Sequence, residues 1–297
     1  MALWQAAAGD RHPLPPALWD ELTAFDPGFR PEDLRVAFEG ETPIGFALTK
    51  QLRAPADLPK FQDRGWIALM AVHPEHQRQG VGTALLAEAE QALKAAGKTA
   101  VNLGESLAHA MPGIPEALTE GRAFFQACGY EPTQEVWDVR GDVATAQPPE
   151  LPAGVTARVL AADEAGALLH FLNETFPGRW AQDMGQYLVE GRPIWHVMGL
   201  FEGGQLRGFA QLHLPGSPGA LRWAGFNPDV AALGPIGVSK DVRGRGLGLG
   251  LLQAGLAHLA SVGATDTVID WTTLLEFYGR VGFKPWLRYQ QARKELA

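Results

Sequence analysis

Two glycine-rich loops repeat in this chain and constrain its fold more than any other feature of the sequence. Residues 77–82 read Gln-Arg-Gln-Gly-Val-Gly, and residues 243–248 read Arg-Gly-Arg-Gly-Leu-Gly. Each loop follows a short apolar run and precedes a segment with helical leucine spacing. Gly80 and Gly246 lie 166 residues apart, which is the length of a domain and not the period of a solenoid. The chain is therefore predicted to be a tandem duplication.

Each loop is predicted to bind an anion at the start of a helix, and a pyrophosphate fits best. Glycines leave the backbone free of Cβ atoms, so several N–H groups can point at one ligand, and the helix dipole favours negative charge there. A simple helix-starting turn without a ligand is the alternative. Neither loop contains the Gly-Lys-Ser/Thr of a nucleotide phosphate loop, and the spacing of residues 244–250 differs from that of dinucleotide-binding glycines.

A second signature follows each loop. Residues 124–130 and 277–283 each begin with an aromatic pair and end in Gly-aromatic. Together with the spacings Gln77-x-x-Gly80-x-Gly82 and Arg243-x-x-Gly246-x-Gly248, these residues resemble the GNAT superfamily of N-acetyltransferases. The resemblance implies the GNAT fold twice, which is an α/β (α+β) arrangement with a mixed central sheet flanked by helices in each domain.

Apolar patterning predicts strands and helices in series in both halves. In the first half, strands are expected at 34–38, 44–49, 65–72, 99–103 and 135–140, and helices at 16–25, 85–94 and 122–128. In the second half, strands are expected at 155–160, 195–202, 206–214, 233–238 and 267–270, and helices at 162–175, 181–190 and 249–260.

The domain boundary is predicted near residue 147, because residues 141–154 contain consecutive prolines that neither continue a helix nor donate to a sheet. This gives GNAT-like domains at 1–146 and 147–297. The marker glycines are 49 residues apart in the first half (80 to 129) and 36 apart in the second (246 to 282). An insertion of 13 residues is therefore expected in or near the irregular loop 104–115.

Composition narrows the class of partner and the compartment. All eight net negative charges lie in residues 1–146, which argues against a nucleic-acid surface and favours cationic partners or solubility alone. No apolar stretch is long enough to cross a bilayer, and residues 1–5 do not resemble an export signal. The single cysteine, Cys128, excludes an internal disulfide and fits best as a core residue. A cytoplasmic protein without membrane or nucleic-acid partners is predicted.

The resemblance implies acetyl-CoA, or another short acyl-CoA, as co-substrate. Loop residues would hold the pyrophosphate, and the backbone of the strand before the loop would line the pantetheine arm and help hold the thioester carbonyl. The cofactor residues expected in the second half are Ile236, Gly237, Val238, Arg243, Gly244, Arg245, Gly246, Leu247 and Gly248. Those expected in the first half are Ala71, Val72, Gln77, Arg78, Gln79, Gly80, Val81 and Gly82.

Acyl transfer from a thioester to an amine needs a deprotonated amine and a proton for the departing thiolate. Tyr278 matches the family position of the general acid, whereas its counterpart Phe125 has no proton to donate. The second half is therefore predicted to be catalytic, and the first half to bind acyl-CoA without turnover or to act as a scaffold. Asp270 is predicted as general base, with Glu202 and Glu174 as alternatives. A core tyrosine and a loop-capping aspartate are the structural alternatives.

The acceptor amine is predicted to contact Arg179, Trp180 and Trp271, although Trp180 is as well explained by packing. The histidines lack metal-ligand spacing, so no metal is expected. The chain is predicted to be an acyl-CoA-dependent N-acyltransferase that acts on the primary amine of a small molecule by direct attack in a ternary complex. A protein or peptide N-acetyltransferase and a non-catalytic acyl-CoA sensor or scaffold remain alternatives, and the sequence leaves monomer and homodimer open.

Overall fold

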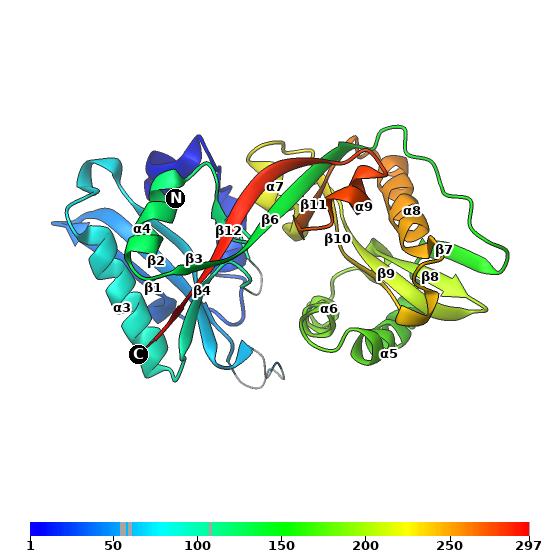
Figure 1. The fold of residues 1–297 in the computed structure, drawn as a ribbon, viewed down its shortest axis with the longest axis horizontal. Helices are drawn as coiled ribbons and strands as arrows, with labels where there is room; N and C mark the ends of the chain where they lie inside the picture. The colour runs from blue at the N-terminus through cyan, green and yellow to red at the C-terminus, as the bar shows by residue number, and fades with distance from the viewer. Residues whose placement is uncertain (54–57, 59–60, 107–108, 297) are drawn as a thin grey trace. The chain divides into compact units, whose positions relative to one another are not determined.

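A computed structural model describes the whole chain except residues 54–57, 59–60, 107–108 and 297. Figure 1 shows the described chain, which forms two compact units. Unit 1 contains residues 1–137, 221–226 and 287–297, and unit 2 contains residues 138–220 and 227–286. The predicted boundary near residue 147 concerns the two sequence repeats and stays a prediction. Part of the predicted insertion loop, residues 107–108, lies outside the described residues.

The sheet of unit 1 begins with the predicted hairpin, β1 (Leu34–Glu39) and β2 (Thr42–Gln51), which pair antiparallel. β2 then pairs antiparallel with β3 (Arg64–Val72), and β3 pairs parallel with β4 (Ala100–Leu103). The parallel pairing covers only residues 64–67 of β3, so the end of β3 that leads into the first glycine-rich loop is free of β4.

Helices cover both faces of this sheet. Successive residues of β2 point to opposite faces, so the contacts of Gly45 and Phe46 identify the helix on each face. A Cβ on Gly45 would lie 3.0 Å from Leu85 of α3 (Val81–Ala95), whereas the Phe46 ring packs at 5.5 Å on Trp19 of α2 (Pro16–Leu22). The predicted apolar face of α3 is confirmed, with the buried residues Leu85, Leu86, Ala89 and Leu93. Further helical segments of unit 1 include α1 (Ala2–Trp4), η1 (Gln5–Gly9), α4 (Thr119–Ala127) and α7 (Leu221–Ala224).

The sheet of unit 2 repeats this order. The strands β7 (Val155–Val159), β8 (Val197–Glu202), β9 (Gln205–His213) and β10 (Ala231–Val238) pair antiparallel in sequence. β10 then pairs parallel with β11 (Asp266–Thr272). The predicted turn at 203–204 is confirmed, since Gly203 and Gly204 have positive φ angles of 58° and 77°.

Two helix layers cover this second sheet. Phe209 of β9 contacts Phe171 of α5 (Ala165–Thr175), whereas a Cβ on Gly208 would lie 3.2 Å from Leu251 of α8 (Leu247–Ser261). α5 and α6 (Arg179–Val189) therefore pack on one face and α8 on the other, as Figure 1 shows for this unit. The predicted helix 249–260 is confirmed and extends back to Leu247.

The closing strands of the two repeats are exchanged. β12 (Lys284–Glu295), the last strand of the chain, pairs antiparallel with β4 of unit 1 from Ala292↔Leu103 to Glu295↔Ala100. β6 (Glu131–Asp142), the closing strand of the first repeat, lies beside β11 of unit 2. The short strand β5 (Ile114–Pro115) also pairs with β12. Each sheet is thus completed by a strand that the other repeat supplies.

Three local features differ from the sequence predictions. α6 begins at Arg179, two residues before the start of the predicted helix 181–190, so Arg179 and Trp180 form its first turn. Trp195 lies in a 3-10 turn, Ile194–His196, outside β8, and its side chain is 57% exposed. The strand β12 was not predicted: the last strand expected in the second half was 267–270, although residues 284–295 match β6 in length.

Removing residues 287–297 is expected to unfold unit 1 selectively. A chain that ends at Trp286 leaves the backbone edge of β4 unpaired and exposes the buried residues that face Ala292. Hydrogen exchange of residues 64–103 should then approach the unprotected rate, while β8 to β10 stay protected. A chain that ends at Glu295 keeps all of β12 and is the control. Equal protection of residues 64–103 in both chains would contradict the exchange.

His12 predicts a pH dependence of the stability of unit 1. The ring is 3% exposed and contacts Phe226 and Tyr289 edge to face, and burial lowers its pKa from 6.5 to about 4. Because the unfolded chain binds the proton more readily between those values, stability is complete above pH 6.5 and falls as the pH drops towards 4, by about 3 kcal/mol.

Urea unfolding at pH 7.5, 6 and 5 measures this loss. His12→Phe keeps an aromatic ring but cannot titrate, so its unfolding free energy should fall less over the same range. His170→Gln on the exposed face of α5 is the matched control. A His12→Phe curve parallel to that of the wild type would refute the assignment.

Candidate active site

The second glycine-rich loop joins β10 to α8 through a 3-10 turn, Lys240–Val242. Gly244 and Gly246 have positive φ angles of 76° and 79°, and Gly246 is the N-cap of α8. A Cβ on either glycine would meet no atom within 4 Å. The N–H groups of residues 247–249 have no partner inside the helix, as at every helix start. The loop thus combines open space with donors suited to an anion.

The first loop has the same conformation. It follows a 3-10 turn, Pro74–His76, and Arg78 has a positive φ of 62° where the second loop has Gly244. Gly80 is the N-cap of α3 with φ 89°, and a Cβ there would again meet nothing within 4 Å. Both predicted loops therefore have the geometry of an anion site, and their binding of acyl-CoA stays a prediction.

The charges around the two loops differ. In the second half, Arg245 binds Glu202 through N···O distances of 2.5 and 3.2 Å, and Arg207 pairs with Asp241 at 3.2 Å. In the first half, the side chains of Gln77 and Gln79 instead donate to the backbone carbonyls of Val72 and Glu75, at 3.0 and 2.8 Å. The second loop contains two arginines, Arg243 and Arg245, and the first loop one, Arg78, so the second is the more cationic although Glu202 offsets part of its charge.

β10 and β11 separate where the predicted pantetheine residues begin. Their parallel pairing comprises Ala231↔Thr267 and Ala232↔Val268, after which β10 has an irregularity between Leu233 and Ile236. From Ile236 to Val238 the strand stays paired with β9 on its other edge. The edge of residues 236–238 that faces β11 is thus not paired with that strand, and its use by the pantetheine arm stays a prediction.

Asp270 and Tyr278 lie near each other beyond this separation. Asp270 is near the end of β11, and Tyr278 is in α9 (Leu275–Gly279) with 6% of its surface exposed. Burial first and the charge of Asp270 second raise the pKa of Tyr278 to about 12, while a side-chain hydrogen bond with Thr272 opposes the shift. The phenol is therefore neutral at physiological pH and can act as a donor.

Of the three predicted acceptor residues, two are in contact. The guanidinium of Arg179 lies 4.7 Å from the centroid of the Trp271 ring, a cation–π distance. Trp180 packs at 5.0 Å on Phe176 and at 5.8 Å on Phe209, so its ring is part of the aromatic cluster under β9. These ring contacts support a packing role for Trp180.

The backbone at Trp271 is in the left-handed region, with φ 46°. A bulky residue there costs on the order of 1–3 kcal/mol and persists only where its surroundings enforce it, most often at functional sites. Its counterpart after the parallel strand of the first half, Glu105, also has a positive φ, 64°. The preceding residues are Asp270 in one half and Gly104 in the other.

The alternative bases have other surroundings. Glu202 is bound by Arg245, whose hydrogen bonds lower the pKa of this carboxyl. Glu174 is exposed on α5. Only Asp270 among the three lies beside Tyr278, so the geometry favours it over the other two candidates.

The aromatic pairs of the two halves match. Phe124 and Phe125 in α4 have ring centroids 5.2 Å apart, and Phe277 and Tyr278 have centroids 5.0 Å apart. The marker glycines Gly129 and Gly282 both have φ 87°. Phe125 therefore occupies the place of Tyr278, and Gly104 the place of Asp270.

Two residues near the site were not singled out from the sequence. Thr272 shares a hydrogen bond with Tyr278, and its Oγ1 accepts the N–H of Leu274 at 2.9 Å. Asp138 on β6 is 1% exposed, and its Oδ1 accepts the N–H of Trp271 at 3.2 Å. The sequence pattern does place a carboxylate, Asp138, at an inward position of the predicted strand 135–140, and this unusual position could have identified it.

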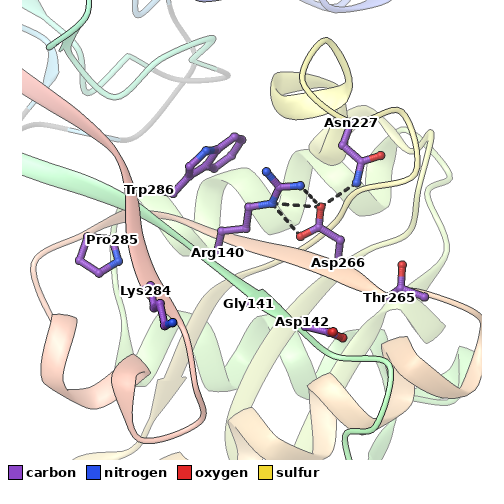
Figure 2. A pocket seen from close by; sticks show the side chains of 9 residues that line it. All are labelled: Arg140, Gly141, Asp142, Asn227, Thr265, Asp266, Lys284, Pro285 and Trp286. Atoms are coloured by element: carbon purple, nitrogen blue, oxygen red, sulfur yellow. Dashed lines mark hydrogen bonds and ion pairs between the residues drawn. The ribbon is translucent and has the colours of Figure 1, made fainter.

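A hollow of about 540 Å³ lies near Asp266, at the opposite end of β11. Figure 2 shows the side chains that line it. Inside it, Arg140 binds Asp266 in a bidentate manner with N···O distances of 2.6–3.1 Å, and Asn227 donates to the same carboxylate at 2.7 Å. Burial opposes ionisation of Asp266, but these hydrogen bonds leave its pKa below the ordinary value. Since Arg140 is on β6 and Asp266 on β11, the pair fastens the exchanged strand.

Comparison with known proteins decides the family. The chain matches the Acetyltransferase (GNAT) family over residues 3–130 and again over residues 166–283. It belongs to this family. As a GNAT chain with two such regions, it is an N-acetyltransferase of tandem architecture, and the predicted family and fold class are confirmed.

The relatives include mycothiol acetyltransferases. That of Nocardia farcinica is 30% identical over 240 residues, which cover 77% of this chain and 74% of the relative. That of Salinispora arenicola is 29% identical over 243 residues, which cover 75% and 72%.

Solved structures confirm the fold. A glucosamine N-acetyltransferase region of a fungal multi-domain GH3 β-N-acetylglucosaminidase aligns with a TM-score of 0.86 at 24% identity, covering 99% of this chain and 36% of that one. The chain thus spans about a third of that protein. A tandem GNAT protein from the clavulanic acid biosynthesis pathway aligns with a TM-score of 0.64 at 18% identity, covering 94% of both chains.

GNAT acetyltransferases use acetyl-CoA, so the loops fit the family's co-substrate. In the described part of the chain, no group of three or more His, Cys, Asp or Glu side chains is arranged to hold a metal ion. The same residues include no helix with the length and apolar character needed to span a membrane.

Substituting the N-cap glycines tests the loops. Gly246→Ala should fold, because its Cβ meets no atom and the left-handed backbone costs about 1 kcal/mol, but it should weaken acetyl-CoA binding at least about tenfold by crowding the donors. Gly80→Ala tests the first loop in the same way. Calorimetric titration with acetyl-CoA measures both effects.

Each variant has a matched control at the other end of its helix. Gly263 follows α8 with φ 95°, Gly97 follows α3 with φ 81°, and neither Cβ would meet an atom within 4 Å. Gly263→Ala and Gly97→Ala carry the same backbone cost without touching a loop. If they weaken binding as much as the loop variants do, the loops are not the sites.

Proposed function

We propose that this chain transfers an acetyl group from acetyl-CoA to the primary amine of a small molecule, in the second half of the chain. The observation that carries the proposal is the grouping of Asp270 and Tyr278 beside the separated ends of β10 and β11, next to the more cationic loop. The mycothiol acetyltransferase relatives support a small-molecule acceptor. The single cysteine supports a cytoplasmic location, which stays a prediction.

In this proposal the loop residues 243–248 and the start of α8 bind the pyrophosphate. The pantetheine arm lies along residues 236–238 of β10, whose backbone groups face the gap and can donate to the thioester carbonyl. The acetyl carbon is then presented between the ends of β10 and β11. A short acyl chain suits this position, because Phe176 and Trp180 pack directly under Gly237.

The amine enters beside Trp271 and Arg179 and reacts in a ternary complex. Asp270 accepts a proton from the amine, the nitrogen attacks the acetyl carbon, and the C–S bond breaks as the C–N bond forms. Tyr278 donates its phenolic proton to the departing sulfur and is reprotonated through solvent. Its raised pKa keeps the donor protonated before the reaction. Trp180 supports Gly237 from below and is assigned a packing role.

The first half is proposed to bind acyl-CoA without turnover, or to serve as a scaffold. It has the loop geometry but has Phe125 and Gly104 where the second half has Tyr278 and Asp270. A titration with two acetyl-CoA molecules per chain would support binding by both loops, and one would support binding by the second loop alone.

The test is Tyr278→Phe with a screen for CoA release over amino sugars, aminoglycosides, polyamines and amino acids. Loss of a general acid should lower kcat by about a hundredfold or more while leaving acetyl-CoA affinity nearly unchanged. The converse variant Phe125→Tyr is the matched control and should not raise the rate, because Gly104 supplies no carboxylate. A Tyr278→Phe enzyme with full kcat would remove Tyr278 from the chemistry.

A further inference from the structure

Asp138 is the residue through which the first repeat reaches the candidate active site. It lies on β6, the exchanged strand, and only 1% of its surface is exposed. Its Oδ1 accepts the N–H of Trp271 at 3.2 Å. A hydrogen bond to a carboxylate is stronger than one between neutral groups, so this contact can hold a backbone conformation that is otherwise unfavourable.

Such a conformation is present at Trp271. Its φ of 46° is unusual for a residue with a large side chain, and the N–H that Asp138 accepts belongs to the same residue. The orientation of this peptide unit is coupled directly to the position of Asp270, which precedes it. The contact therefore acts on the chain segment that carries the proposed base.

The groups around Trp271 are those of the proposed reaction. Arg179 stacks on its ring at 4.7 Å, and Thr272, the next residue, shares a hydrogen bond with Tyr278. A rotation of the Trp271 backbone would move the acceptor-facing ring and the base together. Asp138 itself is buried, and its contact with this group is through the Trp271 backbone.

A different contact, between Arg140 and Asp266, attaches β6 to β11. Arg140, two residues along β6, binds Asp266 near the start of β11 in a bidentate manner. Asp138 is thus not required to fasten the strand. Its contact lies towards the other end of β11, at the left-handed residue Trp271 itself.

The first half has no equivalent of this contact. β6 and β12 are both strands of 12 residues, and the eighth residue is Asp138 in one and Gln291 in the other. Gln291 is also 1% exposed, but its amide donates to the carbonyl of Pro112 in the inserted loop at 2.9 Å. The buried carboxylate therefore accompanies only the half that has Asp270 and Tyr278.

We propose that Asp138 is a positioning residue for acetyl transfer, which fixes the left-handed backbone of Trp271 and thereby places Asp270 and the Trp271–Arg179 pair for the acceptor amine. This inference rests on the function proposed above. It assigns to the first repeat a direct contribution to the site of the second, through the exchanged strand.

The kinetic test compares Asp138→Ala with Asp138→Asn, which keeps an oxygen acceptor for the N–H of Trp271. Asp138→Ala should lower kcat/KM for the amine at least tenfold and leave KM for acetyl-CoA within twofold, whereas Asp138→Asn should stay within about threefold of the wild type. Asp142→Ala is the matched control, because Asp142 is on the same strand and also accepts a backbone N–H, that of Ala144 at 2.9 Å. Equal losses in Asp138→Asn and Asp138→Ala, or no loss in either, would overturn the proposal.

A second measurement does not depend on the acceptor. In a double-mutant cycle of urea unfolding, Asp138→Ala should shift the midpoint less in a Trp271→Gly background than in the wild type, because glycine adopts the left-handed backbone without support. The double variant also provides a folded protein if Asp138→Ala alone does not fold. Equal shifts in both backgrounds would overturn the contact, whereas a wild type that acetylates no amine of the screen would overturn only the proposed function.

Discussion

The rest of the candidate site depends on where the hydrogen bonds between β10 and β11 stop. Two residue pairs join these parallel strands, at Ala231↔Thr267 and Ala232↔Val268, and the strands then separate. Backbone N–H and C=O groups released from a sheet must find other partners or water. An extended, amide-containing ligand can satisfy them in the gap, as a further strand would. The end of β11, with Asp270, and α9, with Tyr278, lie beyond this gap. The reactive end of such a ligand would therefore lie near these two residues.

The same separation occurs in the first half, where the pairing of β3 with β4 runs from Arg64↔Ala100 to Ile67↔Leu103 and then stops. The two halves therefore share the loop, the gap and the left-handed residue after the parallel strand. They differ in the side chains that face the gap. Asp270 and Tyr278 correspond to Gly104 and Phe125, and the cationic residues around the second loop correspond to glutamines around the first. The fold is duplicated, but the chemistry is proposed for one copy.

Because β6 and β12 are exchanged, the folding of each repeat depends on a strand of the other. Each sheet would otherwise end at a short parallel strand, β4 or β11, whose outer edge would be unpaired. Residues 292–295 of β12 cover that edge in unit 1, where Lys294 also binds Glu90 of α3 at 2.7 and 2.9 Å. β6 covers it in unit 2. A strand that completes one sheet while its connections belong to the other repeat makes each half dependent on the other for its stability.

The sequence by itself determined the duplication, the order of most strands and helices, and both loops. These depend on local signals: glycines at helix starts, apolar periodicity and the spacing of marker residues. It missed the exchange, because β6 and β12 have the same strand pattern and nothing local says which sheet either one joins. It also missed Asp138, since a carboxylate 133 residues from its partner becomes meaningful only when β6 lies beside β11. Tertiary structure decided these points, because they depend on long-range pairing of backbones and on burial, which no short stretch of sequence specifies.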